Sequence, residues 1–156
     1  MNENEKKGIG LEFIQQLRSK CKDIESFKTT LKEFASESSE NRAAVGMGLL
    51  AIGADKSEAA SYRNVMLTQL ALFVRSCGLR NNKNVQEQLN YVIDDWIATL
   101  PNQQIPSGAL LALARVNRNA ALEKCDHVIK HYGESEAGRH VRKLREDFER
   151  LNPLEV

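Results

Sequence analysis

Apolar residues recur every three or four positions along most of this chain, and this spacing constrains its fold more than any other feature. It places apolar side chains on one face of an α-helix. The sequence has no alternation of apolar and polar residues long enough to predict a strand, and only three of its 156 residues are proline. The chain is therefore predicted to be all-α.

Polar residues divide the periodic segments into about eight helices. Asp23, either Asn117 or Asn119, and Ser135 stand where helix N-caps are expected, and Gly78 stands where a helix should end. The expected helices cover residues 9–21, 24–34, 43–54, 57 or 58 to 77, 84–100, 107–116, 120–132 and 137–151.

The short connections between these helices favour consecutive antiparallel hairpins. We expect a single compact domain over residues 9–152, arranged as a helical bundle or a short α-solenoid, with residues 1–8 as a flexible N-terminus. The segment 43–54, AAVGMGLLAIGA, is apolar on every side and should be central. Glycine costs about 0.5–1 kcal/mol in a helix relative to alanine, so Gly46 and Gly48 indicate other helices packed close to its backbone.

Composition excludes several classes of protein. The formal net charge is +1, which is too small to name an anionic partner. The longest apolar run is shorter than the ~18 residues of a membrane-spanning helix, and the N-terminus lacks the pattern of a secretion signal. Cys21, Cys77 and Cys125 are widely spaced, as thiols in a reducing compartment usually are. We expect a soluble, cytoplasmic protein without a membrane partner.

The segment 107–151 resembles a tetratricopeptide-type helical hairpin followed by its next helix. Ala109 and Ala121 stand near the small-residue positions of that family. Gly133 stands near its proline position, and no large aromatic residue opens the first helix. The resemblance covers less than a third of the chain. It implies a helical scaffold that binds a protein or peptide.

The stretch CDHVIKHYG concentrates residues that could bind a metal. His127 and His131 are four residues apart, with Glu123 one helical turn earlier, and this spacing can hold a divalent ion. Cys125 falls on the opposite, apolar side of the helix, and His140 belongs to the next helix. We interpret the two histidines as a solvated surface, with a metal site as the remote alternative.

Acidic pairs offer further candidate chemistry. Asp94 and Asp95 could supply a general base or a magnesium ligand, but they lie on the solvent side of an amphipathic helix. Some all-helical nucleotide pyrophosphatases hold magnesium through paired E-x-x-E/D motifs. Glu37 with Glu40, and Asp55 with Glu58, have that spacing here. These pairs fall at helix boundaries, where acidic residues favour the positive end of a helix dipole.

Other signatures of an enzyme are missing from the sequence. The glycines of GMGLLAIG lie in an apolar helix and form no phosphate-binding loop. A serine or cysteine nucleophile would need a histidine within hydrogen-bond reach, which the sequence does not show. We therefore expect a protein that is not an enzyme and that needs no cofactor.

Two basic clusters are candidates for binding a phosphate backbone or a protein partner. The first is Arg75, Arg80 and Lys83 around the central loop, and the second is Arg139, Arg142 and Arg145 on the last helix. Acidic residues alternate with the second cluster, which is typical of a solvated, salt-bridged helix face. Contact with nucleic acid requires folding to bring the two clusters together.

The favoured function is a non-enzymatic protein–protein interaction module, such as an adaptor, regulator, inhibitor or small subunit of a larger assembly. Its motivation is the lack of a chemical motif together with a layout of helices that presents grooves and extended faces. A nucleic-acid-associated subunit that uses the arginine clusters is the alternative. A metal-dependent hydrolase that uses His127, His131 and an acidic residue is the remote one.

Overall fold

The computed structural model describes residues 2–21, 23–100 and 107–151, and these residues form eight α-helices without a strand. The helices are α1 (Glu3–Lys20), α2 (Ile24–Glu37), α3 (Ser39–Ala54), α4 (Ala60–Phe73), α5 (Lys83–Ile97), α6 (Ser107–Val116), α7 (Arg118–Tyr132) and α8 (Glu136–Glu149). The predicted all-α fold class is confirmed. Pro101, Pro106, Asn152 and Pro153, which were expected to bound helices, lie outside the described residues.

The predicted helix ends depend on short polar side chains, and three N-caps are confirmed. The side chains of Asp23, Asn117 and Ser135 each accept a hydrogen bond from a backbone N–H three residues later. Gly78 has a φ of +68°, which glycine adopts without strain. It lies in the turns that follow α4, which ends at Phe73 rather than at Cys77.

α1 begins at Glu3, six residues before the expected helix start at residue 9, so it includes most of the segment expected to be a flexible N-terminus. Asn2 caps this helix, and its side chain accepts a hydrogen bond of 2.8 Å from the backbone N–H of Glu5. Glu3 and Glu5 lie in the first turn, where negative charge favours the helix dipole. Ile9 is 41% exposed, because Gly10, Ile14 and Leu17 form the buried side of α1.

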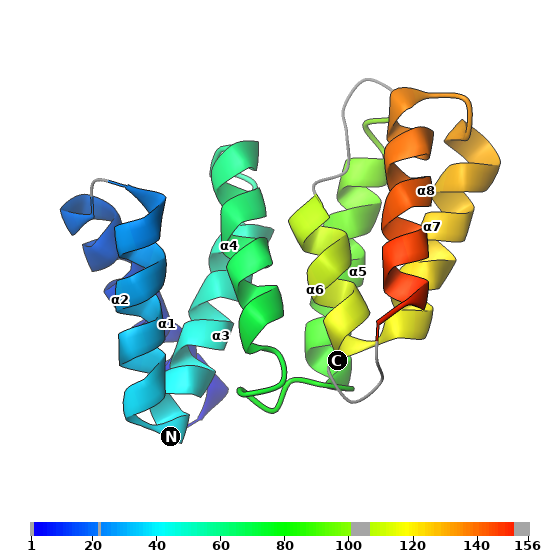
Figure 1. Cartoon of the computed structure of the whole chain (residues 1–156). Coiled ribbons are helices and arrows are strands. Elements are labelled where there is room, and N and C mark those ends of the chain that lie inside the picture. Colours follow the sequence, from blue (N-terminus) through cyan, green and yellow to red (C-terminus); the bar gives the residue numbers. More distant parts are fainter. Residues whose placement is uncertain (1, 22, 101–106, 152–156) are drawn as a thin grey trace.

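The helices form two layers (Figure 1). α2, α4, α6 and α8 lie in front and run in the same direction, whereas α1, α3 and α5 lie behind them, with α7 beside α8. A single hydrophobic core contains buried residues from all eight helices, including Trp96, which is 6% exposed as expected. The expected series of consecutive hairpins is not confirmed. α1 makes its most extensive contact with α3, and α4 packs mainly on α6 and α3 rather than on α5.

α3 is the central helix, as its composition predicts, because it contacts α1, α2, α4 and α5. A Cβ atom added at Gly10 of α1 would lie 1.8 Å from the carbonyl oxygen of Ala44, and one added at Gly48 would lie 2.7 Å from the carbonyl carbon of Gly10. Both glycines therefore serve a packing role. They let the backbones of α1 and α3 touch, which offsets their cost in helix propensity.

α4 and α6 join the N-terminal and C-terminal halves of the chain. A Cβ atom at Gly108 would lie 2.5 Å from both the carbonyl oxygen of Asn64 and the hydroxyl of Thr68, so α6 begins almost in contact with the α4 backbone. The side chain of Asn64 accepts a 2.8 Å hydrogen bond from the backbone N–H of Gly108. Asn64 therefore satisfies one of the free N–H groups at the start of α6.

A buried arginine joins α4 to two further helices. Arg63 is 6% exposed, and its guanidinium carbon lies 4.3 Å from the ring centre of Trp96. Its Nε donates a 2.9 Å hydrogen bond to the carbonyl of Gly53. Burial lowers the pKa of Arg63, while the charges of Asp95 and Asp55 oppose that shift. Arg63 thus links the ends of α3 and α5 to α4.

Candidate binding surface

The outward side of α4 carries exposed apolar side chains. Ser61, Val65 and Leu72 follow a spacing of four and seven residues, which places them on one stripe of the helix. Leu72 is 51% exposed, and Val65 is partly exposed. Apolar side chains therefore continue along this stripe outside the buried core.

A cavity of about 210 Å³ opens between α2 and α4 beside this stripe. Its walls are Ile24 and Phe27 of α2 and Tyr62, Val65 and Met66 of α4, and Arg18 and Cys21 at the end of α1 complete it. α2 packs on α3 and less on α1, and it makes little contact with α4. The cavity exists because two helices of the front layer stay apart. We call this cavity, together with the outward stripe of α4, the α2–α4 face.

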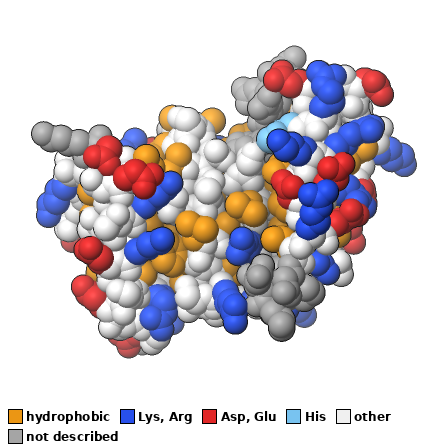
Figure 2. Space-filling view, in the orientation of Figure 1, with side chains coloured by type: hydrophobic (Ala, Val, Ile, Leu, Met, Phe, Trp, Pro, Cys, Tyr) orange, Lys and Arg blue, Asp and Glu red, His pale blue; other side chains and the backbone are white. Residues whose placement is uncertain are grey.

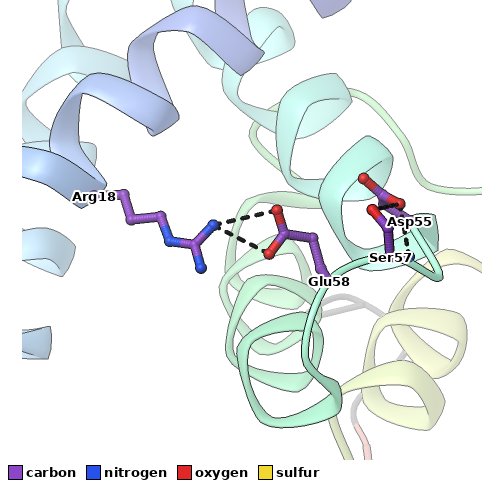
Figure 3. A network of polar contacts seen from close by, with 4 residues as sticks. All are labelled: Arg18, Asp55, Ser57 and Glu58. Atoms are coloured by element: carbon purple, nitrogen blue, oxygen red, sulfur yellow. Dashed lines mark hydrogen bonds and ion pairs between the residues drawn. The ribbon is translucent and has the colours of Figure 1, made fainter.

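Polar groups at the edge of the cavity hold one another in place. Arg18 donates hydrogen bonds of 3.1 and 3.2 Å to the two carboxylate oxygens of Glu58, and its guanidinium lies 4.0 Å from the ring centre of Tyr62. Figure 3 shows Glu58 reaching from the turn before α4 toward Arg18. Asp23, also at this edge, accepts hydrogen bonds from Ser26, which lower the pKa of Asp23.

The hydroxyl of Tyr62 is buried and has no hydrogen-bond partner within the described part of the chain. Burial is the main cause that raises the pKa of Tyr62, so the phenol keeps its proton and remains a donor. An unsatisfied buried donor costs about 1–3 kcal/mol. Tyr62 thus lines the cavity, while its hydroxyl is buried away from solvent and lacks an acceptor.

The charge on this face is uneven. Figure 2 shows hydrophobic side chains gathered over its middle, with Lys and Arg side chains among them and most Asp and Glu side chains toward the two sides. The sequences of α4 and α6 contain no acidic residue, and their basic residues are Arg63 and Arg115. Arg75, one helical turn after Leu72, is exposed. Because Arg63 is buried, the middle of the face is mainly apolar, with Arg75 as an exposed basic residue further along the chain.

The two predicted basic clusters do not form one surface. A hydrogen bond from Asn81 to the carbonyl of Val116 places the loop that carries Arg75, Arg80 and Lys83 at the carboxyl end of α6. The side chain of His140 meets Ser107 at the amino end of α6, so the start of α8 lies at the other end of that helix. Figure 1 shows the same separation.

Arginines of α8 also interact with neighbouring groups of the protein. Arg145 pairs with Asp126 at 2.6 Å and with Glu149, and these hydrogen bonds raise its pKa. Arg139 donates a 2.9 Å hydrogen bond to the carbonyl of Glu134. Arg142 lines a shallow cavity with the end of α7. The charge of Arg145 is therefore largely compensated within the protein.

The histidine pair lies on the exposed side of α7, as predicted. The rings of His127 and His131 are 4.6 Å apart between centres, whereas Cys125 is fully buried. Glu123 and His127 line a small cavity between α5 and α7 together with Asp94 and Lys124. Across residues 2–21, 23–100 and 107–151, no three His, Cys, Asp or Glu side chains are placed to share a metal ion.

The candidate acidic pairs are divided among other partners. Asp94 pairs with Lys124 of α7 at 2.6 Å, and Asp95 pairs with Lys56 at 3.0 Å, so the two carboxylates face different neighbours. Asp55 accepts hydrogen bonds from the backbone and the hydroxyl of Ser57, while Glu58 faces Arg18 (Figure 3).

The other magnesium-type pair is divided in the same way. Glu37 accepts a 3.1 Å hydrogen bond from the side chain of Asn41, and Glu40 lies in the first turn of α3. That turn favours negative charge, as the sequence indicated.

The structure also brings together a serine and a histidine that are far apart in the sequence. The Ser107 hydroxyl lies 2.9 Å from Nε2 of His140. A nucleophilic serine also needs backbone donors for the developing oxyanion. The nearest such donor, the N–H of Gly108, is already bonded to Asn64. The pair ties the start of α8 to the start of α6.

Two of the three thiols, those of the partly buried Cys77 and the buried Cys125, are poor nucleophiles. Burial raises the pKa of Cys77 to about 11 and that of Cys125 to about 12. Cys77 also donates a 2.8 Å hydrogen bond to the carbonyl of Arg42. Cys21 is only partly buried, and it lines the cavity of the α2–α4 face.

Comparisons with protein family models, with curated proteins and with solved structures each gave no match. The tetratricopeptide resemblance of residues 107–151 therefore stays a prediction. Ala109 and Ala121, which carry it, are fully buried. None of the described helices is long and apolar enough to cross a membrane.

The sequence did not reveal the α2–α4 face. The position of α2 relative to α4 across the front layer depends on helix packing. One signal was present. Leu72 is exposed while Leu67 and Leu70 are buried, so α4 has apolar residues on more than one side.

Proposed function

We propose that this protein is a non-enzymatic protein-binding module that holds a segment of another protein on its α2–α4 face. The observation that carries the proposal is the cavity of about 210 Å³ between Ile24 and Val65, together with the exposed Leu72 further along α4. Contiguous exposed apolar surface beside a concave site is typical of interaction sites.

Burial of this surface would contribute to the affinity for a partner. Ile24 and Leu72 are 42% and 51% exposed, and full burial of such a side chain contributes about 1.5–3 kcal/mol. Because both are already partly buried, each would contribute the lower part of that range. A few such anchors account for most of the free energy of many interfaces.

The free cysteines support a cytoplasmic location as part of this proposal. Cys21, Cys77 and Cys125 are all unpaired. Free thiols persist in a reducing compartment, which is where such a module would meet its partner.

The proposal is tested by purifying the tagged full-length chain from its own host with and without nuclease. A protein recovered in a fixed ratio under both conditions is the expected result. Recovery of nucleic acid alone, or of proteins that disappear after nuclease treatment, would contradict it.

Association with nucleic acid is the second candidate, and one observation favours it. Arg75, Arg80 and Lys83 are exposed around one loop, and within the described residues no acidic side chain forms an ion pair with them. Such a cluster could contact a phosphate backbone. Binding to an RNA or DNA duplex that weakens steeply with added salt, and that is lost in Arg75→Glu, would support this function.

A further inference from the structure

We infer that the protein has a second binding surface, separate from the α2–α4 face, that contacts the phosphate backbone of double-stranded nucleic acid without reading its sequence. The surface lies where α4 and α6 end and α5 and α7 begin (Figure 1). We call it the basic end, and it consists of Arg42, Arg75, Arg80, Lys83 and Arg118. The inference rests on the second candidate function, to which it adds two arginines, the form of the nucleic acid and the mode of contact.

Hydrogen bonds bring three segments of the chain together at the basic end. The thiol of Cys77 donates a 2.8 Å hydrogen bond to the carbonyl of Arg42, and the N–H of Asn81 donates one of 2.8 Å to the carbonyl of Val116. The side chain of Asn117 donates a further bond of 3.0 Å to a side chain of α5. The start of α3, the connection from α4 to α5 and the junction of α6 with α7 are therefore neighbours.

Arg42 and Arg118 extend the basic cluster of the loop. Burial is the main cause that raises the pKa of Cys77, and the charge of Arg42 opposes this rise, so the Arg42 guanidinium lies close to the loop. Arg118 is partly exposed and donates a 2.7 Å hydrogen bond to the backbone carbonyl of Leu151. This bond uses one N–H group and brings no negative charge to Arg118.

Carboxylates do not offset the charge of the basic end within the described part of the chain. None of its basic side chains forms an ion pair with a described acidic residue. Residues 59–86 include no Asp or Glu, and Glu40 and Glu87 are the nearest acidic residues along the chain. Glu3 also reaches this end and accepts a hydrogen bond of 3.5 Å from Asn84. Figure 2 shows Lys and Arg side chains in the lower middle of the molecule, with most Asp and Glu side chains toward the two sides.

Two of these charges do not stabilise the helices that carry them. Lys83 and Arg118 are the first residues of α5 and α7, where the positive end of the helix dipole disfavours a cation. Neither first turn contains an acidic residue, whereas the first turns of α1, α2, α3 and α8 do. A phosphate bound beside these side chains would offset the repulsion.

The surroundings of the cations favour a duplex over a single strand. Proteins that bind single strands without sequence preference stack the bases on exposed aromatic rings. Among the exposed large apolar side chains of the described residues, only Tyr91 is aromatic, and it lies against Lys56. Lys56 follows the end of α3, whereas Arg42 lies at its start. The basic end therefore offers charge without a stacking surface.

The positions of the cations favour contact with phosphates rather than with bases. Reading of bases requires a helix face or a pair of strands in a groove, whereas these side chains come from a loop and from helix ends. The exposed side chains of Ser76, Asn81 and Asn84 lie among them and add hydrogen-bond donors for phosphate oxygens. We therefore expect binding that does not depend on sequence.

An anionic membrane fits this surface less well than a duplex does. Surfaces that bind lipid combine positive charge with apolar side chains that enter the membrane. Val74 and Leu79, the large apolar residues of the connection from α4 to α5, are 0% and 4% exposed. The connection therefore has no such side chain to insert.

The test is a titration of the full-length protein into a labelled RNA duplex of about 20 base pairs, the equivalent DNA duplex and the separate single strands, followed by fluorescence anisotropy. With four or five phosphate contacts, the logarithm of the binding constant should fall with the logarithm of the salt concentration with a slope of about −4. Affinity should therefore fall about 200-fold between about 50 and 200 mM salt. Duplexes of unrelated sequence should bind equally, and single strands should bind more weakly.

Arg75→Gln, Arg80→Gln and Lys83→Gln should each weaken duplex binding severalfold and make the salt slope shallower by about 1. All three side chains are exposed, so the variants should keep the circular dichroism spectrum and the melting temperature of the unchanged protein. Arg139→Gln is the matched control. It removes the same charge from an exposed side chain at the start of α8, near the opposite end of α6, and should leave duplex binding unchanged.

Tighter binding of single strands than of duplexes, a salt slope near zero, or equal losses in Arg75→Gln and Arg139→Gln would each overturn the inference. Tighter binding of phosphatidylserine vesicles or of polyglutamate would assign the basic end to a membrane or to an acidic protein instead. A preference for single strands would leave nucleic-acid association intact as a function. Failure to bind any nucleic acid would refute both, while the protein-binding function is decided separately by the purification with nuclease.

Discussion

The two sides of α4 illustrate opposite uses of a helix surface. On one side, α6 approaches so closely that Gly108 has no room for a Cβ atom, and Asn64 caps the incoming helix. On the other side, α2 stays apart and leaves a cavity lined by Ile24 and Val65. The first side is satisfied within the fold, while the second retains apolar surface and an unsatisfied hydroxyl. The difference indicates which side is available to a partner.

Thiol reactivity should give the largest difference between the open and the closed regions. At pH 8 we expect a maleimide reagent to modify Cys21 rapidly, and Cys77 and Cys125 at about a hundredth of that rate or less. The raised pKa values of about 11 and 12 leave the buried sulfurs almost entirely protonated, and only the thiolate reacts. Mass spectrometry of time points measures the rates.

The same pKa values determine how the rate of thiol labelling changes with pH. Because the thiolate fraction rises about tenfold per pH unit below the pKa, labelling of Cys77 and Cys125 should accelerate up to about pH 11 and 12, respectively. In denaturant all three cysteines should react. Fast labelling of Cys125 in the native protein at pH 8 would contradict the closed core.

Gly108→Val should be strongly destabilising, because it forces the closed side of α4 apart. The new side chain would overlap the carbonyl oxygen of Asn64 and the hydroxyl of Thr68. We expect a loss of about 3 kcal/mol in unfolding free energy, or roughly 10 °C in melting temperature. Thermal unfolding followed by circular dichroism measures it.

Gly8→Ala is the control for this substitution. Gly8 lies in α1 with no atom within 4 Å of an added Cβ, so alanine should stabilise the protein by about 0.5–1 kcal/mol. A Gly108→Val protein as stable as the unchanged one would mean that α4 and α6 do not touch as described.

Asn64→Ala tests the same contact between α4 and α6, and its effect on the unfolding free energy should be smaller. The substitution removes the acceptor for the N–H of Gly108 without changing the space between α4 and α6. Loss of a cap costs about 0.5–2 kcal/mol, so we expect about 1 kcal/mol in a denaturant titration. Asn64→Asp retains an acceptor and should recover most of the loss. If both variants were unchanged in stability, the cap would have no energetic role.

Leu72→Glu should have the smallest effect on stability. Leu72 is half exposed on the open side of α4, and surface substitutions usually change the unfolding free energy by less than about 0.5 kcal/mol. The variant should therefore remain folded while it loses its partner. A loss of several kcal/mol would show that Leu72 belongs to the core and would remove it from the binding face.

Helix composition and caps made most of the fold predictable from the sequence. Asp23, Asn117 and Ser135 cap helices where expected, and the glycine-rich helix is central. The start of α1 was missed because its first turns are polar. There, the cap at Asn2 and the acidic residues Glu3 and Glu5 decide the outcome rather than an apolar stripe.

The binding surface was less predictable because it depends on which helices are neighbours. The pattern of α4 alone does not show that α6 covers one side and that α2 leaves the other open. Similarly, the sequence does not show that Arg75 and Arg142 lie near opposite ends of α6. Two clusters of basic residues can therefore lie far apart in the folded protein.

The most direct test of the account is the recovery of a co-purifying host protein by the unchanged chain, by Leu72→Glu and by Ile9→Glu, measured side by side after nuclease treatment. We predict recovery with the unchanged chain and with Ile9→Glu, and loss of the partner with Leu72→Glu. Equal recovery with all three proteins would contradict the assignment of the α2–α4 face as the binding surface.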